Sequence, residues 1–124
     1  MRVFKLKQPD ELVRNGLISN EKLISAAKEL QQGLHNGNLG SGLYKKRVAS
    51  HGRGKRGGCR MLVAYKGKEN IFFLYGYPKN EQSNITEKEK EVYKLLAKHY
   101  LTCRDEIIEK LVENGEIIEV TYGS

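Results

Sequence analysis

The chain is poor in the features that mark membrane, secreted and disordered proteins. It has no tryptophan and only two prolines, and its 124 residues are 39% hydrophobic and 30% charged, as in an ordinary globular domain. No apolar run approaches the roughly 20 residues that a membrane span needs. The first ten residues, MRVFKLKQPD, lack the hydrophobic region of a signal peptide. We therefore expect one domain, spanning residues 1–124, in the cytoplasm.

Cysteine and histidine are also scarce. Cys59 and Cys103 are isolated and form no Cys-x-x-Cys motif, which suits a reducing compartment. A disulfide between the two is the alternative. The three histidines, His35, His51 and His99, show no metal-ligand spacing with the cysteines. We expect neither a metal site nor a cofactor.

Acidic residues are missing from the middle of the chain. None occurs between Gln31 and Lys68, whereas residues 43–60 hold seven cations: Lys45, Lys46, Arg47, Arg53, Lys55, Arg56 and Arg60. The whole chain has a net charge of +7, so the excess positive charge is concentrated in this basic stretch. A concentrated positive field indicates a polyanionic partner, most commonly nucleic acid. The alternative is a solvated loop that only keeps the protein soluble.

The first third of the chain predicts a short strand and one clear helix. Residues 3–7 alternate as in an edge strand, and Pro9 and Asp10 break it. Apolar residues from Leu23 to Leu34 recur at helical spacing after a cap at Ser19 or Asn20. Residues 35–42 are rich in glycine and asparagine, which predicts a turn-rich connection.

The middle of the chain predicts three strands. Residues 43–49, 61–65 and 71–77 are extended runs, separated by a glycine-rich loop at 51–58 and a polar turn at 66–70. If the first two strands pair across the glycine loop, the meander brings Lys45, Arg47 and Arg60 together.

The last third predicts two helices and a small strand. Thr86-x-x-Glu89 and Thr102-x-x-Asp105 both have the capping-box pattern, and residues 117–122 form an apolar run. Residues 87–119 are mildly acidic, so we expect them not to contact phosphate. The fold class is therefore α+β, a small antiparallel β-sheet with N-terminal helices packed on it and C-terminal helices.

The basic stretch suits one reaction in particular. Gly52-x-Gly54-x-x-Gly57 formally matches a dinucleotide-binding motif, but a strand follows it where that motif needs a helix. Metal-free RNA cleavage uses the 2′-hydroxyl of the substrate as nucleophile, so the protein supplies only a base, an acid and cations. Crowding by cations lowers the pKa of a lysine, which favours Lys45 or Lys46 beside Arg47 as the base. Arg60 suits stabilisation of the phosphorane.

Tyrosines accompany the cations. Tyr44 and Tyr77 lie next to them in the sequence and can stack on a base splayed from the RNA, whereas Tyr65 and Tyr75 are expected in the core. We also assign RNA contacts to five further residues: Lys46, Arg53, Lys55, Arg56 and Asn80.

These segments together resemble a known family. The runs Tyr44–Val48, Gly52–Arg60 and Tyr75–Glu81 are similar to RelE-type toxins of bacterial toxin–antitoxin pairs, nearest their HigB-like branch. The resemblance implies a RelE-like toxin fold. It also implies a metal-independent mRNA endonuclease that acts on the translating ribosome, contacts the RNA of the small subunit and is silenced by an antitoxin, often a DNA-binding repressor.

The resemblance assigns the functional residues of the family to individual positions of this chain. The paired basic residues of the family fall on Lys45 and Arg47, the central arginine falls on Arg60, and the basic residue after the last strand falls on Lys79 or Asn80. Where RelE proper has a lysine proposed as the base, this chain has Arg47, a poor base, so that Lys45 or Lys46 would have to substitute.

Two more positions depart from RelE proper. Asn80 stands where that branch has an arginine, and Thr86 stands where it has a tyrosine. Lys79 and Tyr77 are the replacements available, and Glu81 can orient a neighbouring cation.

Two other functions compete with this reading. ParE-type proteins of the same superfamily poison gyrase and cleave no RNA, and they have no need of Lys45, Arg47, Arg60 and Lys79. A plain RNA-binding module would bind RNA without cutting it, and its affinity would fall steeply with salt.

Overall fold

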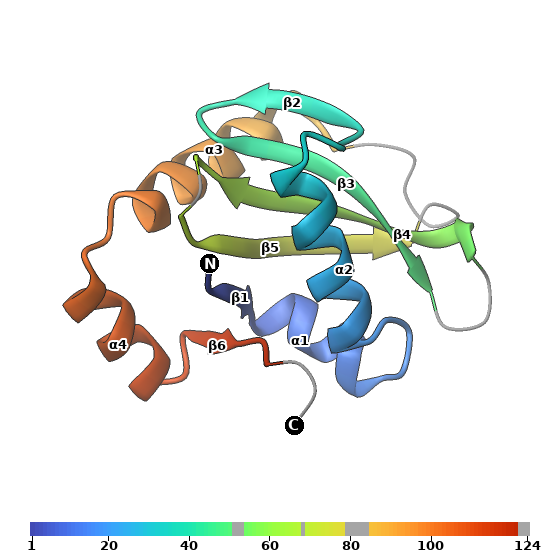
Figure 1. Cartoon of the computed structure of the whole chain (residues 1–124). Coiled ribbons are helices and arrows are strands. Elements are labelled where there is room, and N and C mark those ends of the chain that lie inside the picture. Colours follow the sequence, from blue (N-terminus) through green and yellow to red (C-terminus); the bar gives the residue numbers. More distant parts are fainter. Residues whose placement is uncertain (51–53, 68, 79–84, 122–124) are drawn as a thin grey trace.

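The computed structural model describes residues 1–50, 54–67, 69–78 and 85–121, and of residues 54–57 only the backbone. The elements in chain order are β1 (Val3–Leu6), α1 (Lys7–Arg14), α2 (Asn20–Gln31), β2 (Gly37–Gly40), β3 (Leu43–Ser50), β4 (Gly54–Tyr65), β5 (Ile71–Pro78), α3 (Glu87–Leu101), α4 (Asp105–Glu113) and β6 (Ile117–Glu119). The strands form one sheet in the order β2-β3-β4-β5-β1-β6 (Figure 1). The expected α+β fold class is confirmed.

Helices cover both faces of the sheet, and each face has its own core. Figure 1 shows α1 and α2 in front of the sheet and α3 on its other side. The first core joins Leu23, Ala27 and Leu30 of α2 to strand residues such as Met61 and Phe73. The second core is made by Phe4, Leu43, Leu62, Ala64, Phe72, Leu74, Ala97, Tyr100, Ile108 and Ile117. Within the described residues, no helix is long and apolar enough to cross a membrane.

The N-terminal strand is internal, so its prediction as an edge strand is wrong. β1 runs parallel to β5 and antiparallel to β6, with Phe4 opposite both Phe72 and Glu119. The strand ends at Leu6, ahead of Pro9, as expected. Pro9 lies in the first turn of α1, where a backbone N–H would have no helical partner in any case. Ser19 caps α2 as expected, because its side chain accepts a hydrogen bond from the N–H of Lys22.

The central meander confirms the predicted antiparallel pairing of β3, β4 and β5. Two segments were predicted as irregular but include strands. Residues 37–40 form β2, which pairs with β3, and β4 begins at Gly54, inside the expected glycine loop. Gly58 shows why glycine is needed there, since a Cβ at this position would overlap the carbonyl oxygen of Val48. This glycine therefore serves close strand packing at the irregular end of the β3–β4 pair.

The two capping-box patterns of the C-terminal third have different outcomes. Thr86 and Glu89 form the predicted capping box at the start of α3. Thr102 instead ends α3, where its hydroxyl donates to the carbonyl oxygen of Lys98 at 2.9 Å, and α4 begins without a side-chain cap. The prediction of a second capping box is therefore wrong. β6 confirms the expected small strand.

A β-bulge in β5 changes which side chains share a face. Leu62 pairs with Tyr75 and Val63 pairs with Phe73, so Leu74 is an extra residue on β5. Phe73 packs in the core under α2, whereas Leu74 and Tyr75 both pack in the core under α3. The bulge therefore shifts the rest of β5 by one position, and Tyr77 lies on the face of α3.

We predict that Gly58→Ala lowers the free energy of unfolding by about 2–3 kcal/mol, because the new methyl group would collide with backbone that cannot move independently. Gly37→Ala is the matched control, since its Cβ would lie 3.7 Å from the Cβ of Lys45, an ordinary contact. We expect the stability of this control to be unchanged or slightly raised. Urea denaturation measures both, and equal losses in the two variants would contradict the packing argument.

Candidate functional site

Three polar side chains lie in one row across the central strands. Arg47 of β3 is paired with Arg60 of β4, and Arg60 is paired with Tyr77 of β5. Residues directly opposite in antiparallel strands point to the same face of the sheet. The row therefore lies on the α3 face, and the bulge in β5 is what brings Tyr77 into it.

Two polar atoms in this row are buried without a partner. The Nε of Arg60 and the Oη of Tyr77 make no hydrogen bond to any residue that the structure describes. Tyr77 as a whole is only 3% exposed. Unsatisfied buried polar groups cost free energy and mark places where a ligand can supply the missing partner. A phosphate oxygen is a suitable acceptor for both groups.

Lys45 adjoins this row and has a depressed pKa. Burial lowers its pKa below the usual 10.5, and the positive charges of Arg60 and Lys90 lower it further. The Lys45 ammonium is therefore easier to deprotonate than an exposed lysine. This is the property that was expected of a lysine base crowded by cations.

Tyr77 has a raised pKa. Burial raises the pKa of its phenol above the usual 10.0, the charge of Arg60 acts in the opposite direction, and Tyr75 and Glu89 raise it again. The phenol consequently stays protonated at neutral pH. It can donate a proton or a hydrogen bond, but its ring and its Oη are both buried, so a ligand reaches the hydroxyl only where the neighbouring side chains move aside. The stacking role expected for Tyr77 stays a prediction.

The backbone of the site is braced from neighbouring segments. The N–H of Asn36 donates to the carbonyl oxygen of Lys45, and the side-chain oxygen of Asn36 accepts from the N–H of Arg47, both at 2.8 Å. On β5, the side-chain amide of Gln8 makes two hydrogen bonds to the backbone of Gly76, at 2.7 and 2.9 Å. Lys45, Arg47 and Tyr77 are thus held on fixed backbone.

Two of the predicted residues lie elsewhere. Lys46 points to the opposite face, where it is 5% exposed and its Nζ lies 2.7 Å from Glu29 of α2. It is unavailable either as the base or as an RNA contact in this structure. Tyr44 also lies on that face, with its ring 4.9 Å from His35 and 6.3 Å from Tyr65. The cause is strand alternation, which turns Tyr44 and Lys46 away from Lys45 and Arg47.

The remaining predicted residues cannot be placed. Lys79, Asn80, Glu81 and Arg53 lie outside the described residues, and the side chains of Lys55 and Arg56 are likewise not described. Their assignment to the site stays a prediction.

The sequence reasoning missed the contribution of α3. Lys90 and Glu89 act electrostatically on Lys45 and Tyr77, although the segment 87–119 was expected not to contact phosphate. The net charge of residues 87–119 sums the charges on all sides of the helices, so it did not reveal that one side of α3 is basic. The spacing of Lys90, Lys94 and Lys98, four residues apart, was the available signal of a basic helix face.

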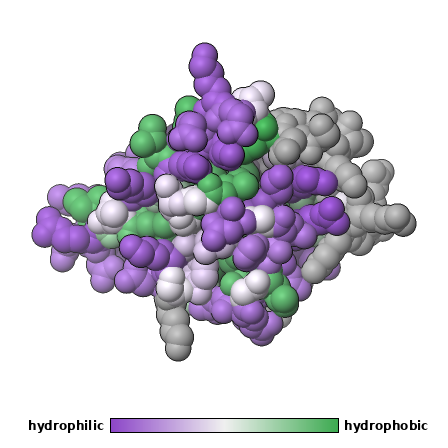
Figure 2. Space-filling model, turned by 90° about the horizontal axis from the view of Figure 1, so that it is seen from above, coloured by the Kyte–Doolittle hydropathy of each residue, from purple (hydrophilic) through white to green (hydrophobic). Residues whose placement is uncertain are grey.

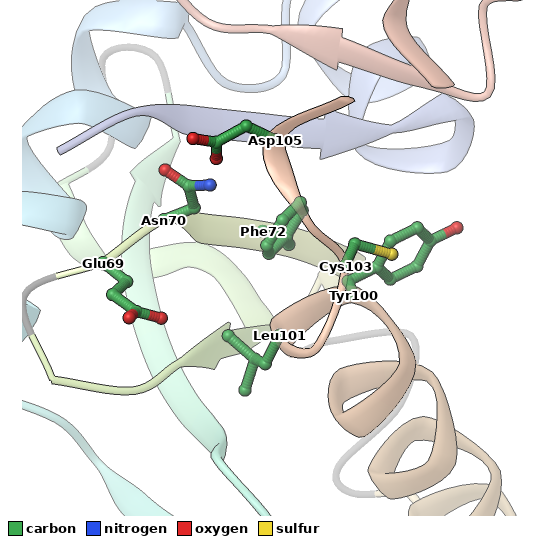
Figure 3. A pocket seen from close by; sticks show the side chains of 7 residues that line it. All are labelled: Glu69, Asn70, Phe72, Tyr100, Leu101, Cys103 and Asp105. Carbon is green, nitrogen blue, oxygen red and sulfur yellow. The ribbon is translucent and has the colours of Figure 1, made fainter. Parts of the chain in front are cut away.

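A separate hollow lies between the start of β5 and the junction of α3 and α4. Its volume is about 240 Å³, and Figure 3 shows the side chains that line it: Glu69, Asn70 and Phe72 from the start of β5 and the turn before it, and Tyr100, Leu101, Cys103 and Asp105 from the junction of α3 and α4. Two of these side chains are carboxylates and none is a cation. The hollow is therefore unsuited to phosphate.

The site as a whole combines two guanidinium groups, a lysine whose pKa is lowered and a phenol whose pKa is raised. These groups suit a reaction in which charge develops on a phosphoryl group and a proton moves at each end. A family model described as "RelE toxin of RelE / RelB toxin-antitoxin system" matches residues 1–120. The match spans every element of the structure.

We predict that Arg60→Gln and Lys90→Gln both raise the pKa of Lys45 toward 10.5, with the larger rise in Arg60→Gln. NMR titration of the Lys45 side chain measures this, and Lys110→Gln on α4 is the control that should leave it unchanged. Because the pKa of Lys45 is lower in the folded protein than in the unfolded chain, its contribution to stability should increase as pH rises between those two values. No change in either variant would mean that burial accounts for the whole shift.

Proposed function

The chain belongs to the RelE family of toxins, and from this membership and the geometry of its site we propose that it is an endoribonuclease that cuts mRNA on translating ribosomes without a metal ion. The observation that carries the proposal is the row of Arg47, Arg60 and Tyr77 beside Lys45, with two buried polar groups left unpaired. The resemblance to the HigB-like branch agrees with it.

The proposed reaction needs only groups from the RNA and from this site. Neutral Lys45 takes the proton of the 2′-hydroxyl, and the 2′-oxygen then attacks the adjacent phosphorus. The bond from phosphorus to the 5′-oxygen breaks, and Tyr77 gives a proton to that oxygen. The products are a 2′,3′-cyclic phosphate and a 5′-hydroxyl, and water returns a proton to the Tyr77 phenolate while Lys45 releases the one it took.

In the proposed reaction, the arginines stabilise the negative charge that develops on the phosphoryl group. Guanidinium groups stay protonated and bind phosphate oxygens in a bidentate manner. Arg60 lies between Arg47 and Tyr77, so it can bind the phosphorane and also stabilise the phenolate as it forms. Lys79, the residue that follows β5 in the sequence, is the further cation that we assign to the site.

The ribosome and the antitoxin enter the proposal because of the charge of the chain and its family. A chain with a net charge of +7 is attracted to ribosomal RNA, and the ribosome presents mRNA in an ordered, unpaired form that suits positioning against Lys45. An antitoxin that lays acidic groups over the basic face would both shield its charge and exclude mRNA. Such an antitoxin, acting in the same cytoplasm, is the protein partner that we propose.

We predict that Arg60→Ala lowers mRNA cleavage at least a hundredfold, because it removes a cation from the centre of the row. The test is inducible expression in cells with mapping of new mRNA 5′ ends, and Arg104→Ala, an exposed arginine before α4, is the matched control. Cuts within translated frames that persist in the control and vanish in Arg60→Ala would support the proposal. Growth arrest without new 5′ ends would contradict it and would favour gyrase poisoning or RNA binding without cleavage.

We also predict that the single-turnover cleavage rate rises with pH toward the pKa of Lys45, below 10.5, because only the neutral amine accepts a proton. Tyr77 should not limit the rate in this range, since its pKa lies above 10.0 and the phenol stays protonated. Quench-flow measurements on purified ribosome complexes give the profile. Lys45→Ala should be slow at every pH and lack this rise, and a residual rise with the same midpoint would assign the base to another group.

A further inference from the structure

A second groove lies at the far end of the sheet from the Arg47 row. It has a volume of about 470 Å³ and is lined by Tyr44 and Tyr65 from the strands, Lys66 from the turn after β4, and Lys98 and Thr102 from the end of α3. None of the residues that line it is acidic. It differs in this from the hollow of Figure 3, which contains two carboxylates.

The groove combines aromatic rings with free cations. Tyr44 and Tyr65 are both half-buried and their ring centroids are 6.3 Å apart. The ammonium groups of Lys66 and Lys98 are exposed, and neither forms an ion pair with a described residue. Aromatic rings beside lysines are the elements with which proteins bind unpaired nucleotides, by stacking on the base and attracting the phosphate.

Two carbonyl groups near the end of α3 accept hydrogen bonds at this groove. The hydroxyl of Thr102 donates to the carbonyl oxygens of Lys98 and His99, at 2.9 and 3.1 Å, so these groups do not face an incoming phosphate unpaired. The chain also passes close here, since Gly42 has a φ of +79° and its carbonyl oxygen accepts from the N–H of Tyr65. The walls of the groove are consequently fixed to the sheet.

A line of lysines connects this groove to the Arg47 row. Lys90, Lys94 and Lys98 recur every four residues and so lie on one side of α3. Lys90 acts on Lys45, the Cε of Lys94 lies over Gly40 of β2, and Lys98 lines the groove. The helix rises about 12 Å from Lys90 to Lys98, which corresponds to roughly three stacked nucleotides.

The acidic neighbours do not block this line. Lys90 and Lys94 pair with Glu87 and Glu91, which are 86% and 67% exposed, and such surface pairs are weak enough to be exchanged for phosphate. Figure 2 shows a face that is mostly hydrophilic, with hydrophobic side chains in small separate groups.

We infer that the groove of Tyr44, Tyr65, Lys66 and Lys98 is a second RNA subsite, which takes an unpaired nucleotide of a strand that runs along the lysines of α3 from the Arg47 row. This inference rests on the proposed function and adds to it, because it assigns RNA contacts to a helix and a turn outside the predicted site. It also gives Tyr44 a role in RNA binding at a different place from the one expected.

The test uses the full chain and a 12-nucleotide RNA with a 2′-O-methyl group at every position, which removes the nucleophile and prevents cleavage. Fluorescence anisotropy gives the Kd. We expect the double variant Lys66→Gln/Lys98→Gln to bind about tenfold more weakly and to lower the salt slope of log Kd by about 1.4. The double variant Lys22→Gln/Lys110→Gln removes the same charge from exposed positions on α2 and α4 and should change Kd less than twofold.

Stacking is tested separately at Tyr65. Tyr65→Leu should weaken binding about tenfold, and Tyr65→Phe, which keeps the ring, should bind like the wild type. Thermal melting shows whether each variant is folded. Equal affinities of Tyr65→Leu and Tyr65→Phe, both folded, would overturn the stacking role.

The outcomes separate this inference from the proposed function. If the wild type cuts mRNA within translated frames, Arg60→Ala does not, and the Lys66/Lys98 variant binds RNA as well as its control, the second subsite is wrong and the proposed function stands. If the Lys66/Lys98 variant binds weakly while the wild type cuts no mRNA in cells, the subsite stands and the proposed function is wrong.

Discussion

Arg47 and Arg60 face each other across β3 and β4, and the fold has to hold these like charges together against their repulsion. Opposed like charges destabilise a strand pair, and burial of the Nε of Arg60 without a partner adds to the cost. The offsetting contributions come from around the row. Two apolar cores clamp the same strands from both faces, and Asn36 and Gln8 fix the backbone beside Lys45, Arg47 and Tyr77. Local stability is thus lower at the row to which we assign phosphate binding.

Strand β3 places its two lysines on opposite faces of the sheet. Lys45 lies on the α3 face, where burial and neighbouring cations lower its pKa. Lys46, the next residue, is ion-paired with Glu29 on the α2 face and ties that helix to the sheet. Adjacent residues of one type therefore serve different ends, one in the chemistry that we propose and one in stability. α3 has a comparable division, since Tyr93, Ala97 and Tyr100 pack inward while Lys90, Lys94 and Lys98 line one side.

Much of the architecture was predictable because it depends on local patterns. The cap at Ser19, the capping box at Thr86 and the pairing of β3 with β4 and β5 all follow from short-range hydrogen bonding and alternation. The errors occurred where a partner far along the chain decides the outcome. β1 is internal because β6, more than a hundred residues later, pairs with it, and residues 37–40 become a strand only because β3 accepts them at its edge. Thr102 has the spacing of a cap but bonds backward to α3.

By itself, the sequence determined the fold class, the family resemblance and the concentration of positive charge in residues 43–60, because composition and spacing carry this information. Only the tertiary structure decided which side chains meet. Strict alternation along β5 would place Tyr77 with Phe73, under α2, and no local signal marks Leu74 as the extra residue. The bulge there reverses the alternation and sets Tyr77 beside Arg60. The packing of α3 then places Lys90 on the same face, although residues 87–119 as a whole are acidic. A site assembled from three strands and a helix depends on register, which pairing across the sheet fixes.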